Sequence, residues 1–289
     1  MITNLSNAER VRVPGERLYE QDIYAKDLDL LQAKTLQRLS ASADVLGIIK
    51  LLGENLNIDI NTMYVDDFKY LIHWFRLKSF SDFPHMVSFT CNHCNKSNEL
   101  PVKSENLVID DVPNELTKDG GVLMAFENYP KGLYIRAPKV GDDFITNALM
   151  KKLEISEEDL DSRSLILDLN LFRNKVNGLD IEDLYKTYKE GKFTTNDLMC
   201  ITAFKQTMGW GVRDEYKFKC EHCKEEVTVI EPLDLTTFFL SGESRRLIRS
   251  RILPILPLET TDNGAGEAPA AVDQLVLQET RKNAKDNPR

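Results

Sequence analysis

The 289-residue sequence contains only five cysteines and four histidines. So few cysteines exclude the dense disulfide framework of a small secreted domain. The first 15 residues carry Glu9, Arg10 and Arg12 and have no apolar core, so we expect no secretory signal. No apolar run approaches the roughly 18 residues that a membrane-spanning helix needs. These absences predict a soluble protein that does not contact a membrane.

The sequence also lacks the motifs of common catalytic sites. It has no P-loop, dinucleotide-binding glycine motif, nucleophile elbow, HExxH motif or kinase signature. Its four scattered histidines form no evident Ser-His-Asp or Cys-His set, so we predict that the protein is not an enzyme and has no small-molecule substrate. The formal net charge is −9. Because binding to a phosphate backbone depends on Lys and Arg, nucleic acid is not expected as the main partner.

Four of the five cysteines form two similar motifs, Cys91-Asn92-His93-Cys94 and Cys220-Glu221-His222-Cys223. Each motif follows an apolar segment that contains Phe and precedes a polar turn. Four thiolates in two CxxC pairs match the requirements of a tetrahedral Zn²⁺ ion. We therefore predict a metal site whose ligands are Cys91, Cys94, Cys220 and Cys223.

A shell of four thiolates leaves no open position for water, so the predicted zinc is structural rather than catalytic. Two alternatives remain open, a redox CxxC and no metal at all. The redox alternative is weaker because neither motif lies at a strand-to-helix junction, where a helix N-terminus would lower a thiol pKa. His93 and His222 are expected to face solvent or to contact the ligands rather than to bind the metal. Cys200 is expected to be a buried structural thiol and His73 a packed helical histidine.

Apolar periodicity and turn residues predict an α+β fold of N-terminal helices and a split zinc ribbon of two CxxC β-hairpins, into which a small β meander and a helical region are inserted. The predicted segments are a flexible N-terminal arm (1–18), an N-terminal helical region (19–83), a first zinc hairpin (84–106), a β meander (107–140), a helical insertion (141–212), a second zinc hairpin (213–232), a C-terminal helical segment (233–253) and a flexible tail (254–289).

The two motifs are separated by residues 95–219, about 125 residues. Loop-closure entropy grows only logarithmically with length, so a metal can hold the ends of so long an insertion together. The zinc is thus predicted to determine shape, and its removal to lower the melting temperature.

Aromatic and basic residues follow the second hairpin. Phe238, Phe239 and Leu240 precede four arginines, and apolar and basic residues together are enriched at protein interfaces. The alternative is a helix of the core with a solvated basic face. The arginines are Arg245, Arg246, Arg249 and Arg251.

Several stretches also carry a resemblance to a known family. They are the helical opening around Leu30 to Leu56, the segment from Asp66 to Arg76, the string from Gly132 to Pro138, and the knuckles from Phe89 to Cys94 and from Phe218 to Cys223. Over about residues 20–240 the chain resembles the baseplate hub and hub-assembly proteins of T-even-type contractile-tailed bacteriophages.

This resemblance implies a structural or assembly role in the virion tail baseplate, with assembly in the host cytoplasm. The implied partners are other phage tail and baseplate hub proteins, including the tape-measure protein, and no catalytic residues are implied. Two alternatives remain, a tail-assembly chaperone for the tape-measure and hub complex, and a zinc-ribbon module that binds nucleic acid.

Overall fold

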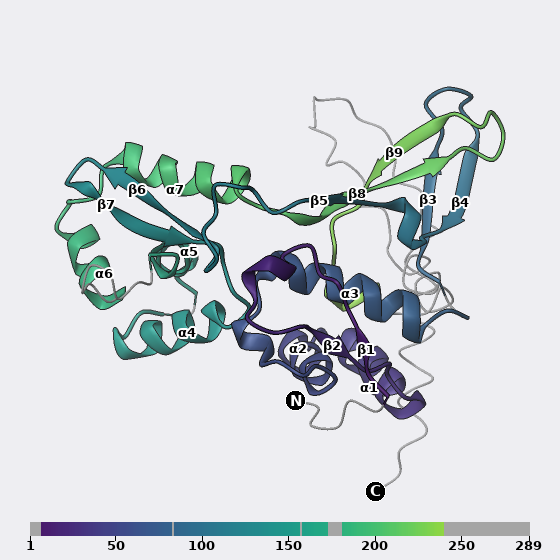
Figure 1. Ribbon diagram of the computed structural model, residues 1–289, viewed down its shortest axis with the longest axis horizontal. Helices are drawn as coiled ribbons and strands as arrows, with labels where there is room; N and C mark the ends of the chain where they lie inside the picture. The colour runs from purple at the N-terminus through teal and green to yellow at the C-terminus, as the bar shows by residue number, and fades with distance from the viewer. Residues whose placement is uncertain (1–6, 83, 157, 173–180, 240–289) are drawn as a thin grey trace, which may run out of the picture. The chain divides into compact units, whose positions relative to one another are not determined.

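The computed structural model describes residues 7–82, 84–156, 158–172 and 181–239, and it combines helices with small antiparallel sheets (Figure 1). This confirms the mixed fold class. The helices are α1 (Leu30–Ala41), α2 (Val45–Glu54), α3 (Val65–Ser79), α4 (Asp142–Lys152), α5 (Leu160–Asn170), α6 (Ile181–Lys189), α7 (Thr195–Thr207) and α8 (Leu235–Phe238). The strands are β1 (Glu9–Arg10), β2 (Tyr24–Ala25), β3 (Met86–Thr90), β4 (Ser97–Pro101), β5 (Leu107–Asp110), β6 (Gly121–Phe126), β7 (Tyr129–Arg136), β8 (Gly211–Lys219) and β9 (Glu226–Ile230). Short 3₁₀ helices cover η1 (Glu16–Leu18), η2 (Ile60–Thr62) and η3 (Ser104–Asn106).

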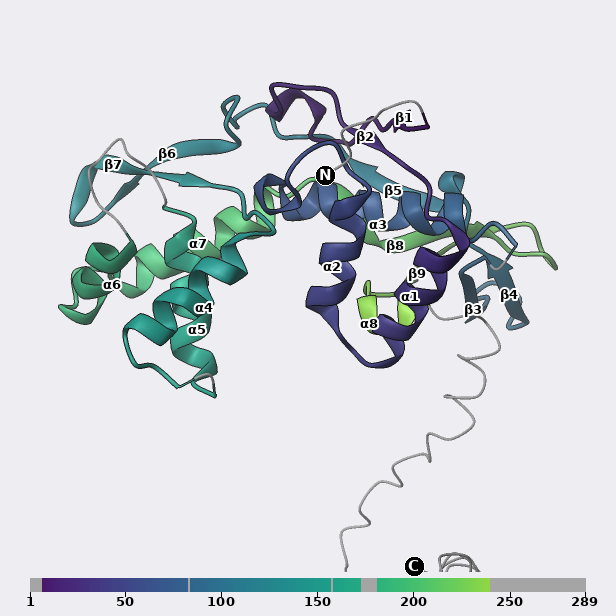
Figure 2. The same cartoon turned by 90° about the horizontal axis from the view of Figure 1, so that it is seen from below.

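One hydrophobic core joins helices α1, α2, α3 and α8 (Figure 2). Asp29 caps α1 through a reciprocal capping box with Gln32, and Asp44 caps α2, so the two helices begin where short acidic residues can accept backbone N–H groups. The core side of α3 buries Phe68, Leu71, Ile72 and Phe75, which recur at the spacing of one helix face.

Phe238 and Phe239 belong to this core and are 3% and 0% exposed. Phe239 lies 5.9 Å from Phe80, ring centre to ring centre, and Phe238 packs against His73. An interface role for these two rings is therefore wrong, and the core alternative is confirmed for them. Leu240 and the four arginines lie outside the described residues.

The N-terminal segment differs from the flexible arm expected for residues 1–18. From residue 7 onward it is part of the fold: Val11 and Val13 are each 3% exposed, and the Val11 N–H donates to the Ile23 carbonyl at 2.8 Å. Strand β1 pairs with β2. Two apolar residues with alternating spacing are too short a pattern to distinguish a packed strand from a loop.

Asp67 connects this N-terminal segment to helix α3. Its fully buried carboxylate accepts hydrogen bonds from the Gly15 N–H at 2.7 Å, the Tyr19 hydroxyl at 2.9 Å and the Trp210 indole N–H at 3.0 Å. Burial raises the pKa of Asp67 to about 6, against the effect of the three donors, and the charge of Asp66 raises it further. One carboxylate thus joins three parts of the chain that are distant in sequence.

We expect Asp67→Asn to change the pH dependence of the unfolding free energy. Because the folded state holds a proton on Asp67 more tightly than the unfolded state, wild-type stability falls as pH rises from about 4 to about 6. The shift from 3.8 to about 6 corresponds to about 3 kcal/mol. Burial lowers the pKa of His73 to about 4, which acts with the opposite sign over the same range. The quantity to measure by urea unfolding at each pH is therefore the free energy of unfolding of the wild type minus that of the variant. A difference that does not change with pH contradicts the prediction.

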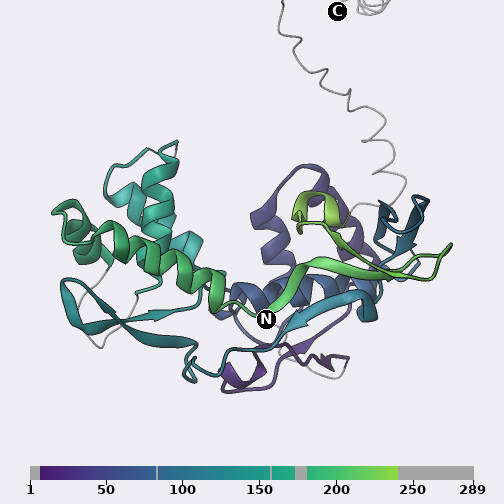
Figure 3. The same cartoon turned by 90° about the horizontal axis from the view of Figure 1, so that it is seen from above.

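Helix α3 also supports strand β8, which lies along it (Figure 3). His73 is 4% exposed, its Nδ1 lies 2.9 Å from the Lys69 carbonyl, and its Nε2 lies 3.2 Å from the Tyr216 hydroxyl. The expectation of a packed histidine is confirmed. The sheet that leads to the second CxxC motif is thereby attached to the helical core.

The expected three-stranded meander over residues 107–140 is wrong. Strands β6 and β7 do form an antiparallel hairpin, but β5 pairs with β8 and gives a sheet in the order β5-β8-β9. Strand β8 begins at Gly211, earlier than expected, and Val212 pairs with Ile109. Turn residues identify the strands, but they do not report a partner about 100 residues away.

A second hydrophobic core joins the β6-β7 hairpin to α5, α6 and α7. Phe126, Phe172 and Phe193 form a cluster with ring centres 5.2 to 6.3 Å apart. Thr194 caps α7 in a capping box with Asp197. Leu18 and Tyr64 also belong to this core, so the inserted helices pack against residues from the N-terminal part of the chain as well.

Candidate metal centre

Each CxxC motif lies in the turn of an antiparallel hairpin, as expected. In the first hairpin Thr90 of β3 pairs with Ser97 of β4, and in the second Lys219 of β8 pairs with Glu226 of β9. The two turns lie side by side (Figure 1). Two local hairpins thus bring together cysteines that are more than 100 residues apart.

The two turns share one backbone geometry. In the first, the Cys91 N–H donates to the Lys96 carbonyl at 2.9 Å, and the Asn95 N–H donates to the Cys91 carbonyl at 2.8 Å. The equivalent bonds in the second turn, both 2.9 Å, run from the Cys220 N–H to the Glu225 carbonyl and from the Lys224 N–H to the Cys220 carbonyl. This repeat places the two cysteines of each motif on one side of the turn.

A left-handed residue closes each turn. Asn95 has φ 57° and Lys224 has φ 66°. Asn adopts this conformation readily, whereas Lys does so less often, so Lys224 is held there by the bonds of the turn. The two turns therefore have the same bend at equivalent positions.

The four sulfurs fit a single tetrahedral ion. All four Sγ atoms lie within 4.8 Å of one another, with Cys91 Sγ 3.6 Å from Cys223 Sγ and Cys94 Sγ 3.7 Å from Cys220 Sγ. A tetrahedron with zinc–sulfur bonds of about 2.3 Å has sulfur–sulfur edges of about 3.8 Å. The observed spacing is compatible with such an ion.

Backbone donors favour the thiolate form of one cysteine. The N–H groups of Cys223 and His222 approach Cys220 Sγ and lower the pKa of Cys220 to about 6. The pKa of Cys223 is raised to about 12, because burial and the neighbouring sulfurs outweigh the Glu225 N–H. Four sulfurs this close cannot all carry charge without a cation between them.

Asn98 joins the two hairpins beside the cysteines. It is buried, its Oδ1 accepts from the Glu221 N–H at 3.0 Å, and its Nδ2 donates to the Lys96 carbonyl at 3.0 Å. Asn98 therefore fixes one turn against the other. Sequence reasoning missed it, because an Asn in a polar strand gives no signal of a contact 123 residues away.

Aromatic stacking supports the same junction. Phe89 and Phe218 stack with ring centres 5.5 Å apart and planes 19° apart. These are the phenylalanines that precede each CxxC motif in the sequence. The repeated phenylalanine therefore has a packing role between the hairpins.

The histidines of the two CxxC motifs and the fifth cysteine, Cys200, do not join the four clustered sulfurs. His93 and His222 are exposed, as expected, and His222 Nε2 lies 3.3 Å from the Ser97 carbonyl. Cys200 on α7 is only half-buried, so the expectation of a buried thiol is wrong there. Among the residues that the structure describes, the four cysteines form a group whose ligand atoms lie close enough together to hold a metal ion.

Three comparisons with known proteins were made, against family models, curated proteins and solved structures, and one of them found a match. The sequence model of the family described as T4 bacteriophage base plate protein matches residues 19–240. No curated protein and no solved structure matches the chain. In the part of the chain that the structure describes, no helix is both long and apolar enough to span a bilayer. Because the match covers well over half of the sequence, the chain belongs to the T4 bacteriophage base plate protein family.

Proposed function

We propose that the protein is a structural component of the baseplate hub of a contractile phage tail and acts by binding other tail proteins. The observation that carries this proposal is the family match over residues 19–240, which includes both hairpins and most residues of the two hydrophobic cores. The proposed partners are hub proteins and the tape-measure protein. The proposed location is the virion tail, after assembly in the host cytoplasm.

We further propose that a structural Zn²⁺ binds Cys91, Cys94, Cys220 and Cys223 and joins the hairpins into a split zinc ribbon. The donor set, the sulfur spacing and the matched turns support this assignment. The ion would hold the ends of residues 95–219 together. The protein would then present a fixed arrangement of surfaces to its neighbours, which lowers the entropic cost of binding.

Quantitative mass spectrometry of purified virions tests the proposed role. A hub component should be present in a fixed ratio to other baseplate proteins, and chemical cross-linking of assembled tails should join it to hub proteins. A tail-assembly chaperone would instead be found in assembly intermediates and be missing from the virion. Its absence from purified virions would overturn the structural role.

A further inference from the structure

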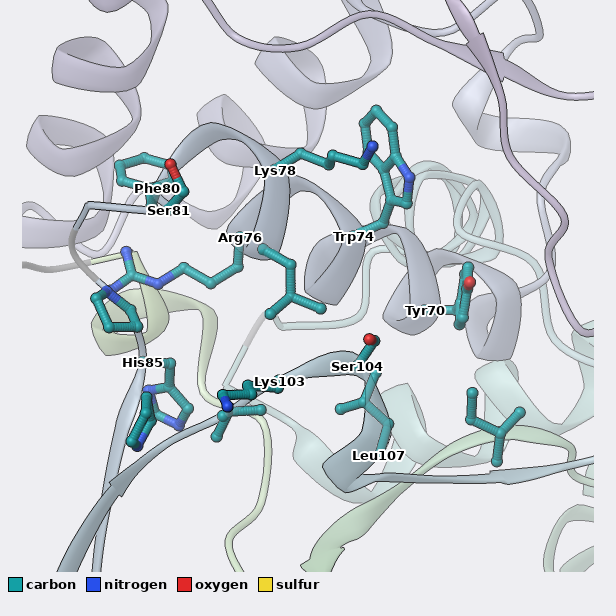
Figure 4. Close-up of a pocket in the computed structure, with 15 residues that line it drawn as sticks. Tyr70, Trp74, Arg76, Lys78, Phe80, Ser81, His85, Lys103, Ser104 and Leu107 are labelled. Carbon is teal, nitrogen blue, oxygen red and sulfur yellow. The ribbon is translucent and has the colours of Figure 1, made fainter.

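An apolar groove of about 540 Å³ lies between helix α3 and the segment that follows strand β4 (Figure 4). Tyr70, Trp74 and Leu77 line it from α3, and Val102, Leu107 and Ile109 line the opposite wall. Ile109 is 44% exposed although it is a large aliphatic residue on a strand. Tyr70, Leu77 and Leu107 are partly buried, and Trp74 and Val102 are buried. A concave surface of this volume lined mainly by apolar side chains is typical of a binding site.

The groove has no acidic lining residue, although the chain as a whole is acidic. Among the 15 described residues that line it, none is Asp or Glu, whereas the whole chain has 46 acidic and 37 basic residues. Lys78 and Lys103 are the exposed basic residues that line it, whereas Arg76, which also lines it, is only 2% exposed. A basic groove on an acidic protein selects a partner that carries carboxylates.

Two ion pairs show that the basic residues at the groove edge can bind carboxylates. Lys78 Nζ binds the carboxylate of Glu9 from β1 at 2.8 Å, so a carboxylate already lies beside the groove. Lys103 has a 64% exposed side chain and approaches Glu105 only to 3.9 Å, a weak pairing in solvent. Lys103 is therefore available to a further carboxylate, and Ile109 and Leu107 to the apolar side chains beside it.

We propose that this groove binds a short segment of a neighbouring tail protein in which aliphatic or aromatic residues alternate with Asp or Glu. The inference rests on the proposed baseplate function and names the surface through which that function is carried out. One wall of the groove continues directly from β4 of the first CxxC hairpin. A metal that fixes this hairpin would also fix the groove.

Binding of fluorescein-labelled peptides tests the proposal. Short overlapping peptides that tile the other structural tail proteins of the same virion are titrated with the full chain, and fluorescence anisotropy is measured. We expect at least one acidic and apolar peptide to bind, with weaker binding at higher salt. Lys103→Glu and Ile109→Asp should each reduce its affinity by roughly tenfold or more, because the first replaces an attractive charge with a repulsive one and the second places a carboxylate against the apolar side chains of the peptide.

Matched variants separate a specific effect from a general one. Lys131→Glu makes the same charge change at an exposed position of β7, and Leu123→Asp makes the same polarity change at a 62% exposed position of β6. Both should bind the peptide like wild type. Equal loss in these controls, no loss in the groove variants, or no binding peptide would each overturn the proposal.

Two further results distinguish this proposal from the proposed function. Concentration-dependent dimerisation that Ile109→Asp abolishes would identify the groove as a contact between copies and overturn the assignment to a tail protein. If the protein is present in virions in a fixed ratio but no peptide binds, the baseplate role stands and the groove assignment fails. If a peptide binds as described but virions lack the protein, the groove assignment stands and the structural role fails.

Discussion

Removal of zinc with EDTA is expected to lower the melting temperature of the full chain by about 10 to 20 °C. In the chain-entropy account, a link that closes a loop of about 100 residues contributes about 5 kcal/mol, and the four cysteines close residues 95–219. Each kcal/mol corresponds to about 2 to 4 °C in a protein of 150 to 250 residues. The loss of zinc–sulfur bonds acts in the same direction.

Elemental analysis and calorimetry measure this effect. We expect one zinc ion per chain, and we expect Cys94→Ser and Cys223→Ser each to lose zinc and to melt at the temperature of the EDTA-treated protein. Cys200→Ser is the matched control, because Cys200 is half-buried and lies outside the cluster. It should keep zinc and melt within a few degrees of wild type.

Two results would contradict the zinc site. The first is a protein without zinc whose melting is unchanged by EDTA, which would leave the four thiols without a metal. The second is a disulfide between the hairpins, detected by thiol titration before and after reduction, which would favour the redox alternative. Cys91 and Cys223 are the pair to examine, since their sulfurs are 3.6 Å apart.

The sequence predicts those parts of the structure that depend on neighbouring residues. The hairpin around Cys91 and Cys94 follows from two short strands and a polar turn, and the start of α7 follows from the N-cap candidate Thr194. Both signals lie within a few residues of the structure they determine. The same holds for the α3 face that begins at Phe68.

Contacts between distant residues could not be predicted in this way. The pairing of Ile109 with Val212 and the bond between Glu221 and Asn98 each join segments more than 100 residues apart. A single sequence reports the propensity of each segment, but not which segment it meets. The four metal ligands are an exception, because the chemistry of a CxxC pair requires a second pair wherever it lies.

A buried ion pair at the start of α4 organises the turn between β7 and α4. The guanidinium of Arg136 donates to both carboxylate oxygens of Asp142, at 2.7 and 3.0 Å, and also to the Ala137 carbonyl at 2.8 Å. The Lys139 N–H donates to the same carboxylate at 2.8 Å. The Arg136 and Asp142 side chains are only 10% and 6% exposed. Arg136, which lies in the string from Gly132 to Pro138, thus joins β7 to Asp142 at the start of α4.

Arg136→Met is expected to reduce the free energy of unfolding by about 3 to 5 kcal/mol, because it leaves the buried Asp142 carboxylate without its cation. Replacing both partners, as Arg136→Met with Asp142→Leu, should recover much of this loss, since no unpaired buried charge remains. Arg163→Met is the matched control: its pair with Asp143 measures 3.0 Å but is solvent-exposed, so the expected loss is under about 1 kcal/mol. Urea unfolding of the four proteins measures these differences. If Arg136→Met costs no more than Arg163→Met, or if the double variant is less stable than the single one, the buried pair does not organise this turn as the geometry indicates.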